Sequence, residues 1–479
     1  MKTFLTIVVS SLLIFFFSWF LVFKLNINDL SLQSEDTIPA LFLPVTLIKE
    51  RTLYADTYYE MIRERYPHPD DKNHEKGLTP FYFRKVTNGE KHYISAFPLT
   101  TGLLAVPIYY LPLKLGMEVT FENLILLGHI SASTIVALAG GVFYLLLSKF
   151  FGLSRSQRLL LTTIYLFATI NFALISQALW QHGTVQLLSL LSLYFLFYGS
   201  ISVRVKKYLF YLASGLFLGL TILTRPTAAL LLPYFGLLLV YKDQKQDFSL
   251  SLKNIDLLFK TTIGYAFKLF LLLVGLFPSY LFFNWYTNIW YKSISNNGYA
   301  NQLFNGWLSR FPEGLLGIWI SPSKGILVYS PVFIFIFVSL IVALRSNVWR
   351  KNVEYLIYFS IVAVHTLVMS RWKHWYGGWG FGYRMASDVI PFLVLLLIPY
   401  LKSDFFKRTK KLFFFIVIFS VLVQIFGIVF FDGIWHAAYD GGFENTTWLW
   451  SIKDSEFAFN IRRLLVKVNL LDRACPKCM

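Results

Sequence analysis

Long apolar runs alternate with short polar connections along almost the whole chain. Twelve such runs lie at roughly 4–23, 98–115, 124–148, 159–177, 184–200, 208–224, 226–241, 262–286, 326–344, 353–370, 386–401 and 412–431. Most approach the ~20 residues that a helix needs to cross the hydrocarbon core of a bilayer. A helix satisfies all of its backbone polar groups internally, as that core requires. The pattern therefore predicts an all-α polytopic membrane protein.

The positions of Lys and Arg indicate how many runs cross the membrane. Five short connections hold Lys149, Arg155 and Arg158; Arg204, Lys206 and Lys207; Lys242, Lys245, Lys253 and Lys260; Arg345, Arg350 and Lys351; and Lys402, Lys407, Arg408, Lys410 and Lys411. Cytoplasmic loops are enriched in these residues. With the N-terminus inside, all five are cytoplasmic only if the run 98–115 does not span. That run contains Pro98, Pro107 and Pro112 and is short for a span, so we expect an interfacial helix there.

The charge pattern thus predicts about eleven transmembrane helices, with the N-terminus inside and the C-terminus outside. Twelve spans with the N-terminus outside satisfy the same rule, but they place 25–97 inside and Lys2 outside. The first run has no small-residue cleavage site, so we expect an uncleaved first span. The expected organisation is a transmembrane domain over 1–431, with a first external loop over 24–123 that contains interfacial helices, and an external tail over 432–479.

Composition agrees with this class and argues against a nucleic-acid-binding protein. Of the 479 residues, 56% are hydrophobic, and the formal net charge is +18. The positive residues fall mostly in short loops rather than in one stripe, as the topology rule predicts. Cys475 and Cys478 form a lone C-x-x-C, which is at best half of a zinc site; a disulfide or a free pair fits equally well.

The first candidate for chemistry is an acidic residue early in the first external loop. The loop begins "LNINDLSLQSEDTIPALFLP", where Asp36 precedes an apolar stretch. A carboxylate there can act as a general base at the membrane surface. The alternative is a helix N-cap, because Ser34, Glu35 and Thr37 also suit a first helical turn. Asp56, in "LYADTYYEMIRERY", is a weaker second candidate.

Other external segments add polar residues next to spans. The turn expected at 178–183 carries Trp180, Gln181 and His182, which either line a site or anchor the interface. Arg225, in "LTRPTA", lies at a helix end, where an arginine ordinarily extends its side chain to the membrane interface. Lys324, in "SPSKG", suits a phosphate or simply marks the interface.

The segment "WKHWYGGWGFGYR", from Trp372 to Arg384, is aromatic, cationic and rich in glycine. On the expected topology it is external, so its positive residues depart from the charge rule. Arg offers paired donors to phosphate, and Trp and Tyr faces suit sugar rings. An aromatic belt with a snorkelling Arg is the alternative, although a belt does not need the glycines.

Three stretches carry a resemblance: "SEDTIPALFLP" (34–44), "YISAFPLTTGLLAVPIYYLP" (93–112) and "WYGGWGFGYRMASDVIPFL" (375–393). With the long external loop and the Pro-rich interfacial helix, they resemble the GT-C superfamily of membrane glycosyltransferases, nearest the protein O-mannosyltransferase and aminoarabinose-transferase branch. "SPSKGILVYSPV" (321–332) is similar to a stretch of uncharacterised bacterial members. The likeness covers most of the chain.

The resemblance implies a hexosyl- or pentosyltransferase with a polyprenyl-phosphate sugar donor. It implies an inverting transfer to a hydroxyl acceptor, at the outer or periplasmic face of a bacterial cytoplasmic (inner) membrane, with Asp36 as general base. Many relatives have Asp-Glu at this point, whereas this chain has Glu35-Asp36, which leaves open which carboxylate acts. The sugar, and whether the acceptor is a glycan, a lipid or a protein, also stay open.

The chemistry of the leaving group is consistent with a single base. Glycoside hydrolases need two carboxylates, whereas a polyprenyl phosphate is a stable anion that leaves unprotonated. We expect one base plus cations, with Arg384, Arg371, Lys373 or Lys324 holding the phosphate. The expected substrate-binding residues are Glu35, Trp180, Gln181, His182, Lys324, Arg371, Lys373, His374, Tyr383 and Arg384. No cofactor or metal-ligating set is predicted, and dependence on a divalent metal stays open.

A secondary transporter or flippase of a lipid-linked or anionic substrate is the alternative function. Such proteins show broken helix pairs and charges near the midplane, whereas the spans here carry few charges and no internal repeat. A lipid-linked-polymer ligase is expected to carry its large external loop late in the chain, whereas here the longest external loop is the first one. A non-catalytic scaffold also stays open. The sequence lacks the motifs of P-loop NTPases, serine hydrolases and zincins.

Overall fold

The structure is a computed structural model that describes residues 2–27, 32–88, 90–247, 255–290, 306–345 and 353–474. These residues are mostly helical. Cys475 and Cys478, and with them the C-x-x-C motif, lie outside the described residues.

Eight helical segments of the described chain are long and apolar enough to cross a membrane. They are α1 (Lys2–Lys24), α5 (Phe121–Phe150), α7 (Gln181–Ile201), α8 (Arg204–Thr224), α10 (Ile255–Trp290), α15 (Val353–Ser370), the continuous segment Arg384–Leu401 and α18 (Asp404–Phe430). The segment Arg384–Leu401 consists of η7 (Arg384–Val389), α16 (Ile390–Leu395) and α17 (Ile398–Leu401). The predicted class is therefore confirmed: the chain is a helical integral membrane protein.

Three predicted apolar runs form shorter or interrupted helices. The run 159–177 becomes α6 (Arg155–Phe167) followed by the π-helical η2 (Asn171–Ile175). The run 226–241 becomes η3 (Pro226–Leu231) and α9 (Leu232–Asp247), and the run 326–344 becomes α13 (Ile326–Tyr329), η5 (Pro331–Ile334) and α14 (Phe335–Arg345). Proline explains two of these interruptions, because Pro226 and Pro331 lack the amide hydrogen that a continuing helix needs.

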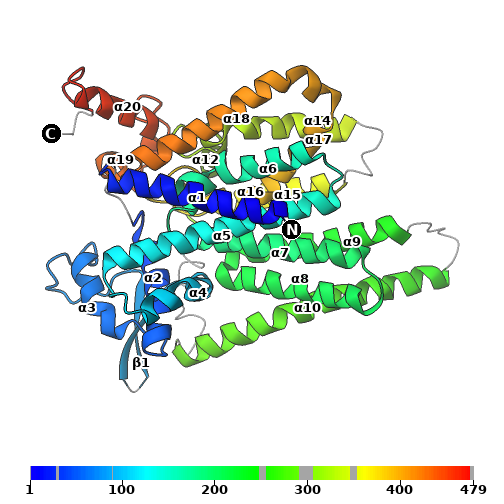
Figure 1. The fold of residues 1–479 in the computed structure, drawn as a ribbon, viewed down its shortest axis with the longest axis horizontal. Helices are drawn as coiled ribbons and strands as arrows, with labels where there is room; N and C mark the ends of the chain where they lie inside the picture. Colours follow the sequence, from blue (N-terminus) through cyan, green and yellow to red (C-terminus); the bar gives the residue numbers. More distant parts are fainter. Residues whose placement is uncertain are drawn as a thin grey trace.

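The long helices lie side by side and run in roughly the same line across the molecule (Figure 1). α7 packs against α5, α8 and α9, while α1 packs on α5. α8 and α10 approach each other most closely at Gly215 and Gly275. A Cβ atom at Gly215 would lie 2.1 Å from the carbonyl oxygen of Leu272, so only glycine permits this approach.

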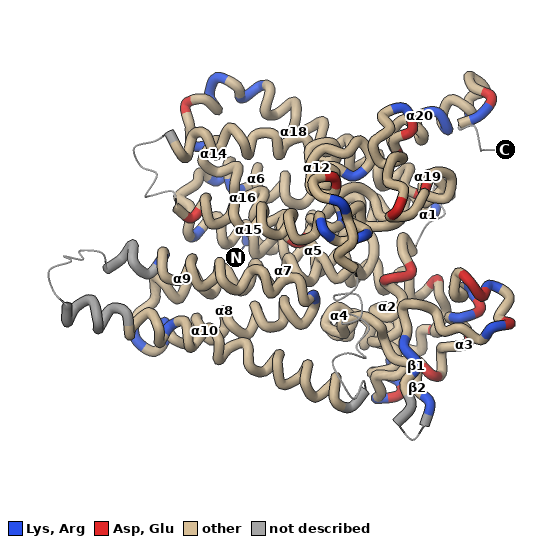
Figure 2. Tube along the Cα trace, turned by 180° about the vertical axis from the view of Figure 1, so that it is seen from behind, with Lys and Arg blue, Asp and Glu red and all other residues tan. Residues whose placement is uncertain are grey.

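The two ends of the bundle differ in structure and charge. One end carries α2, α3, the β-strands, α19 and α20, whereas at the other end α9 and α14 stop, α10 begins and α17 connects to α18 (Figure 1). Lys and Arg lie at both ends, at α8 and α18 and around α20 and the hairpin, whereas most Asp and Glu lie at the former end (Figure 2). We call the end that carries α3 and α20 the α20 end.

The first predicted external loop folds into short elements at the α20 end. These are η1 (Glu35–Thr37), α2 (Ile38–Lys49), α3 (Asp56–Arg65), the antiparallel hairpin β1 (Phe83–Asn88) and β2 (Glu90–Ser95), and α4 (Thr100–Lys114). The sequence reading did not predict the hairpin. Asp56, the weaker acidic candidate, fixes it: its carboxylate accepts a hydrogen bond from the Tyr93 amide at 2.6 Å and contacts His92 Nδ1 at 2.7 Å.

α4 corresponds to the Pro-rich run that was expected not to span. It has 15 residues, contains Pro107 and Pro112, and is not among the eight long apolar segments. It packs on α2, where Gly102 lies against Leu43: a Cβ atom at Gly102 would lie 2.9 Å from Leu43 Cδ2.

The chain after α18 folds back over the aromatic segment 372–384. It contains α19 (Ile434–Tyr439), η8 (Thr447–Leu449) and α20 (Glu456–Lys467). Ring centroids lie 6.4 Å apart for Trp375 and Trp450, and 5.6 Å apart for Tyr376 and Trp448. Much of the aromatic character of both segments is therefore explained by their mutual packing.

Candidate functional site

The ion pair between Asp36 and Arg384 joins two of the segments singled out in the sequence. Asp36 Oδ2 accepts a hydrogen bond from Arg384 Nη2 at 2.6 Å. Both side chains are partly exposed, at 25% and 19% respectively. Asp36 lies in η1, where the Ser34 hydroxyl accepts a hydrogen bond from the Asp36 amide at 3.3 Å. Ser34 is thus the cap of this turn, which leaves the Asp36 carboxylate available for other partners.

Trp180 forms a platform under the guanidinium group. Arg384 Cζ lies 4.5 Å from the centroid of a Trp180 ring, within the range of a cation–π contact. The indole is buried, and its Nε1 donates to Gln33 Oε1 at 3.4 Å. Gln33 in turn donates to the carbonyl of Ala173 at 3.3 Å. The aromatic platform is therefore anchored both to the segment before η1 and to η2.

Arg384 retains a donor that the described residues do not use. Its Nε is buried and has no hydrogen-bond partner among them. A guanidinium group has five N–H donors arranged to bind carboxylate or phosphate through two bonds at once. The arrangement leaves donor capacity for an anion beside Asp36.

Two glycines of the aromatic segment allow the backbone to lie against the Arg384 side chain. Gly377 has φ +82°, and a Cβ atom there would lie 2.9 Å from Arg384 Cβ. A Cβ atom at Gly380 would lie 3.1 Å from Arg384 Cδ. The glycines that an aromatic belt does not need are thus required for the path of the chain around this arginine.

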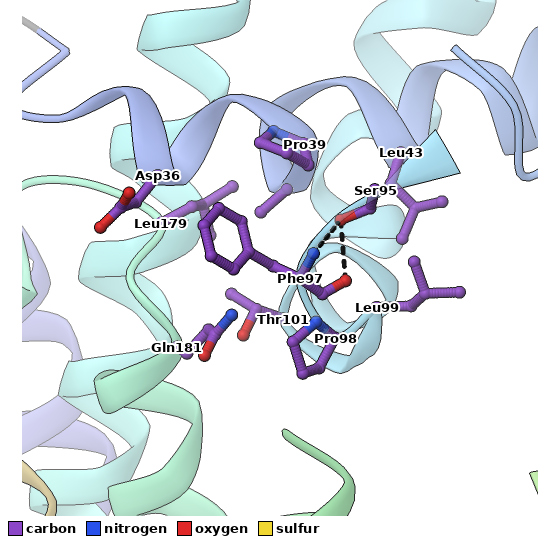
Figure 3. Close-up of a pocket in the computed structure, with 11 residues that line it drawn as sticks. Asp36, Pro39, Leu43, Ser95, Phe97, Pro98, Leu99, Thr101, Leu179 and Gln181 are labelled. Atoms are coloured by element: carbon purple, nitrogen blue, oxygen red, sulfur yellow. Dashed lines mark hydrogen bonds between the residues drawn. The ribbon is translucent and has the colours of Figure 1, made fainter. Parts of the chain in front are cut away.

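A small cavity, with about 10 Å³ of free space or roughly the room of one water molecule, adjoins Asp36. It lies between the starts of α2 and α4 and the turn before α7 (Figure 3), and its lining residues are Asp36, Pro39, Ala40, Leu43, Ser95, Phe97, Pro98, Leu99, Thr101, Leu179 and Gln181. Asp36 and Gln181 lie toward one side, and Leu43 and Leu99 toward the other (Figure 3). The cavity therefore combines a carboxylate and an amide at one side with a largely apolar interior.

The two neighbouring carboxylates have different environments. Burial, and then the charge of Asp36, raise the pKa of Glu35. Glu35 thus keeps its proton to higher pH than an exposed glutamate, and Arg384 pairs with Asp36 instead. Of the two, Asp36 is the carboxylate at the cavity.

His182 belongs to a buried polar cluster that the sequence reading missed. Asp388 Oδ1 lies 2.7 Å from His182 Nδ1, and Asp388 Oδ2 lies 3.3 Å from Arg225 Nε and 3.5 Å from His365 Nε2. Arg225 is buried in this cluster and does not snorkel. His182 lies in the first turn of α7 rather than in an exposed turn, because α7 begins at Gln181.

Asp388 could have been found by its place in the sequence. It lies in "MASDVIPF", inside the predicted run 386–401, and an acidic residue within a span usually has a partner or a function. Here four helical segments, α7, α8, α15 and η7, each supply or adjoin one member of the cluster. The cluster therefore joins these four segments. Its central residue, Asp388, follows Arg384 by four residues in the chain.

Lys324 lies behind the aromatic segment rather than at the cavity. It is 1% exposed, and its Nζ donates to the carbonyl of Gly380 at 2.5 Å and lies 2.9 Å from His436 Nε2. Burial lowers the pKa of Lys324 to about 8, with Arg384 acting in the same direction and Glu456 opposing it. Because Gly380 contacts the Arg384 stem, Lys324 fixes the backbone that holds Arg384.

Four further predicted residues, Arg371, Lys373, His374 and Tyr383, belong to the aromatic segment and the turn that precedes it. Tyr383 shares a hydrogen bond with Ser330 at 2.7 Å, and His374 Nδ1 lies 3.0 Å from the Tyr376 hydroxyl. Burial, and then Lys373, lower the pKa of His374 to about 4, so this ring is neutral at pH 7. Lys373 lies over Phe443, and Arg371 is exposed.

Comparisons of the chain with protein-family models, with curated proteins and with solved structures each return no match. Within the described ranges, no group of three or more His, Cys, Asp or Glu side chains could hold a metal ion.

Proposed function

We propose that the protein is a glycosyltransferase that moves a sugar from a polyprenyl phosphate to a hydroxyl acceptor. The observation that carries the proposal is the pairing of Asp36 with Arg384 over an aromatic ring, beside a small cavity with polar and apolar lining residues. One carboxylate and one guanidinium group are the two groups that such a transfer needs. The resemblance of the sequence to GT-C glycosyltransferases supports the same reaction.

The transfer needs three events. Asp36 takes the proton of the acceptor hydroxyl, whose oxygen attacks the anomeric carbon of the sugar. The bond between that carbon and the phosphate oxygen breaks, and its electron pair leaves with the polyprenyl phosphate. Arg384 binds the phosphate and stabilises the growing negative charge, while the Trp180 ring holds the guanidinium group in place. Attack from the face opposite the leaving group inverts the anomeric carbon.

The donor phosphate and Asp36 compete for one arginine in this scheme. Arg384 must exchange at least part of its bond to Asp36 for the phosphate, and Asp36 then regains a free oxygen for the acceptor. Arg371 and Lys373 remain candidates for a second phosphate contact, since both belong to the same segment. Lys324 acts through Gly380.

The proposed topology has eleven spans. It counts the eight long segments together with α6–η2, η3–α9 and α13–η5–α14, and it leaves α4 at the interface. With the N-terminus in the cytoplasm, the α20 end is external, and the opposite end is cytoplasmic. This orientation agrees with the positive-inside rule and places the cavity at the periplasmic side of a bacterial inner membrane.

The direct test is incubation of the purified protein with a panel of polyprenyl-phosphate sugars and a mixed set of glycan, lipid and protein acceptors. Release of polyprenyl phosphate together with labelling of an acceptor supports the proposal. The Asp36→Asn variant should lose transfer, while Asp70→Asn, at an exposed position of the same loop, should keep it. Full transfer by Asp36→Asn would remove Asp36 from the mechanism.

The buried cluster around Asp388 favours a second candidate, a transporter or flippase of an anionic lipid. Ionisable residues inside a helix bundle often mark the path of an ion or substrate. Proteoliposomes loaded with a fluorescent lipid phosphate distinguish the two functions. A transporter translocates the lipid without an acceptor and loses this activity in Asp388→Asn, whereas the glycosyltransferase needs the acceptor and Asp36.

A further inference from the structure

The helix α20 exposes a continuous apolar stripe on the side away from the protein. Ile461, Leu464, Leu465 and Val468 are 51%, 41%, 36% and 59% exposed. They follow the spacing i, i+3, i+4 and i+7, which places them on one face of a helix.

The opposite face of α20 is fixed to the protein by polar contacts. Glu456 accepts a hydrogen bond from the Tyr329 hydroxyl at 2.8 Å, and Phe459 and Asn460 are buried. Arg463 forms an ion pair with Asp432 at 2.7 Å, and Arg462 with Asp454 at 3.2 Å. These contacts hold α20 with its apolar stripe outward, so the exposure of the stripe is imposed by the fold.

The stripe continues the lipid-facing surface of α18. Ile418, Leu422 and Ile425 of α18 are exposed apolar residues on a transmembrane helix. The next residue, Phe426, has its ring centroid 5.2 Å from that of Phe457, which lies about one turn before the stripe and also packs on Tyr329 at 4.9 Å. α20 lies beside the end of α18 and toward the margin of the bundle, as Figures 1 and 2 both show.

Basic residues border the stripe. Lys467 ends α20, and Arg473 lies two residues beyond the exposed Leu470 and Leu471, after the acidic Asp472. An amphipathic helix with an apolar face and Lys or Arg at its border binds at the level of the lipid headgroups, and anionic lipids strengthen that binding.

We propose that α20 is an interfacial anchor that inserts its apolar stripe into the leaflet at the α20 end of the bundle. Its partner is the lipid interface, and the basic residues Lys467 and Arg473 contact anionic headgroups. The anchor has a consequence for the candidate site. The same C-terminal segment carries His436 and Glu456, which contact Lys324 and Tyr329 behind the aromatic segment. The membrane thereby holds the segment that supports Arg384.

The test places an environment-sensitive fluorophore (NBD) on single cysteines in the full-length protein, with Cys475 and Cys478 replaced by serine. Three positions are compared in proteoliposomes: Leu464→Cys on the stripe, Leu422→Cys on the lipid-facing side of α18, and Lys453→Cys in the exposed turn before α20. Quenching by spin-labelled lipids reports contact with the bilayer and does not depend on glycosyl transfer.

We expect the label at Leu464 to emit at short wavelength and to be quenched by lipids labelled near the headgroup, as a residue at shallow depth should be. The label at Leu422 should be quenched from deeper in the bilayer, and the label at Lys453 should resemble one in water. Raising the share of anionic lipid should increase quenching at Leu464 in the parent but not after Lys467→Gln and Arg473→Gln. A water-like signal at Leu464, or a buried signal that no lipid quencher reaches, would overturn the proposal; the latter would indicate a protein partner or a second copy.

Discussion

Asp36 and Arg384 are 348 residues apart in the chain, yet their side chains form an ion pair of 2.6 Å at the edge of a cavity. The pair brings the first external loop and the aromatic segment together. While Arg384 occupies Asp36 Oδ2, that oxygen cannot accept the proton of an acceptor hydroxyl. In the proposed reaction, the donor phosphate draws Arg384 toward itself and thereby frees Asp36 for the acceptor.

Replacing Arg384 should weaken donor binding more than it changes the fold. A charged hydrogen bond to phosphate contributes about 1.5–3 kcal/mol, so Arg384→Gln should raise the KM for the donor roughly 10- to 100-fold. Arg384→Lys keeps the charge but loses the paired donors and should lie in between. Arg371→Gln, at an exposed position of the same segment, tests the other predicted cation. An unchanged donor KM in Arg384→Gln would exclude Arg384 as the phosphate ligand.

Two neighbouring glycines form a matched pair of probes for the support of Arg384. Gly377 and Gly378 have φ +82° and +59°, so alanine at either position strains the backbone by about 1–2 kcal/mol. A Cβ atom at Gly377 would meet Arg384 Cβ, whereas a Cβ atom at Gly378 would meet nothing within 4 Å. Both variants should lower the thermal stability, but only Gly377→Ala should also raise the donor KM, by about tenfold or more. Equal donor KM values would show that the contact with Arg384 has no role in binding.

Burial of Lys324 should make the stability of the protein depend on alkaline pH. Its pKa falls from 10.5 to about 8 on folding, so the unfolded chain binds more protons between these values. The free energy of unfolding should therefore rise with pH from about 8 to 10, by at most about 1.4 kcal/mol per pH unit. Glu456 and His436, which face Lys324, titrate below this window: the pKa of Glu456 is raised to about 7, and that of His436 is lowered.

The comparison variant is Lys324→Met, which keeps the length of the side chain and cannot titrate. The difference in the free energy of unfolding between the parent and this variant should shift in favour of the parent as the pH rises from 8 to 10. Hydrogen exchange of the peptides that cover 376–384 should also be faster in the variant at pH 7, because Gly380 loses its lysine donor. Parallel pH profiles of the two proteins would contradict the assignment.

The topology can be checked by cysteine accessibility. In eleven spans, positions 90 and 118 lie on the same, external side of the membrane, because α4 does not cross. Glu90→Cys and Glu118→Cys, in a protein without Cys475 and Cys478, should both react with an impermeant maleimide added to intact cells. Lys206→Cys, in the first turn of α8, should react only after lysis. Opposite accessibility of positions 90 and 118 would refute the eleven-span arrangement.

The sequence was sufficient to predict the class of the fold and to single out the two segments of the candidate site, which contain Asp36 and Arg384. Apolar runs of spanning length predicted the membrane helices, since the bilayer core imposes both length and composition. The hairpin Phe83–Ser95 was missed, because its strands are short and polar and lie within a loop. The interruption of α6 before Asn171 was also missed, since an apolar run does not reveal whether its helix is continuous.

Within the site, the sequence could name residue types but not partners. Asp36, Trp180 and Arg384 were all candidates, yet only the fold shows that their side chains meet. Lys324 looked like a phosphate ligand next to a span, but its amine is buried against Gly380 and His436. Asp388 was overlooked because its partners, His182, Arg225 and His365, come from three other helices. Long-range pairing of this kind leaves no local pattern.

The measurement that tests the central claim most directly separates donor binding from transfer in Asp36→Asn. The variant loses the base and also releases Arg384 from its ion pair. We therefore expect its affinity for a polyprenyl-phosphate sugar to equal or exceed that of the parent, while the transfer rate falls by about 100- to 10,000-fold. Unchanged transfer by Asp36→Asn, or donor binding lost together with transfer, would contradict the roles assigned to Asp36 and Arg384.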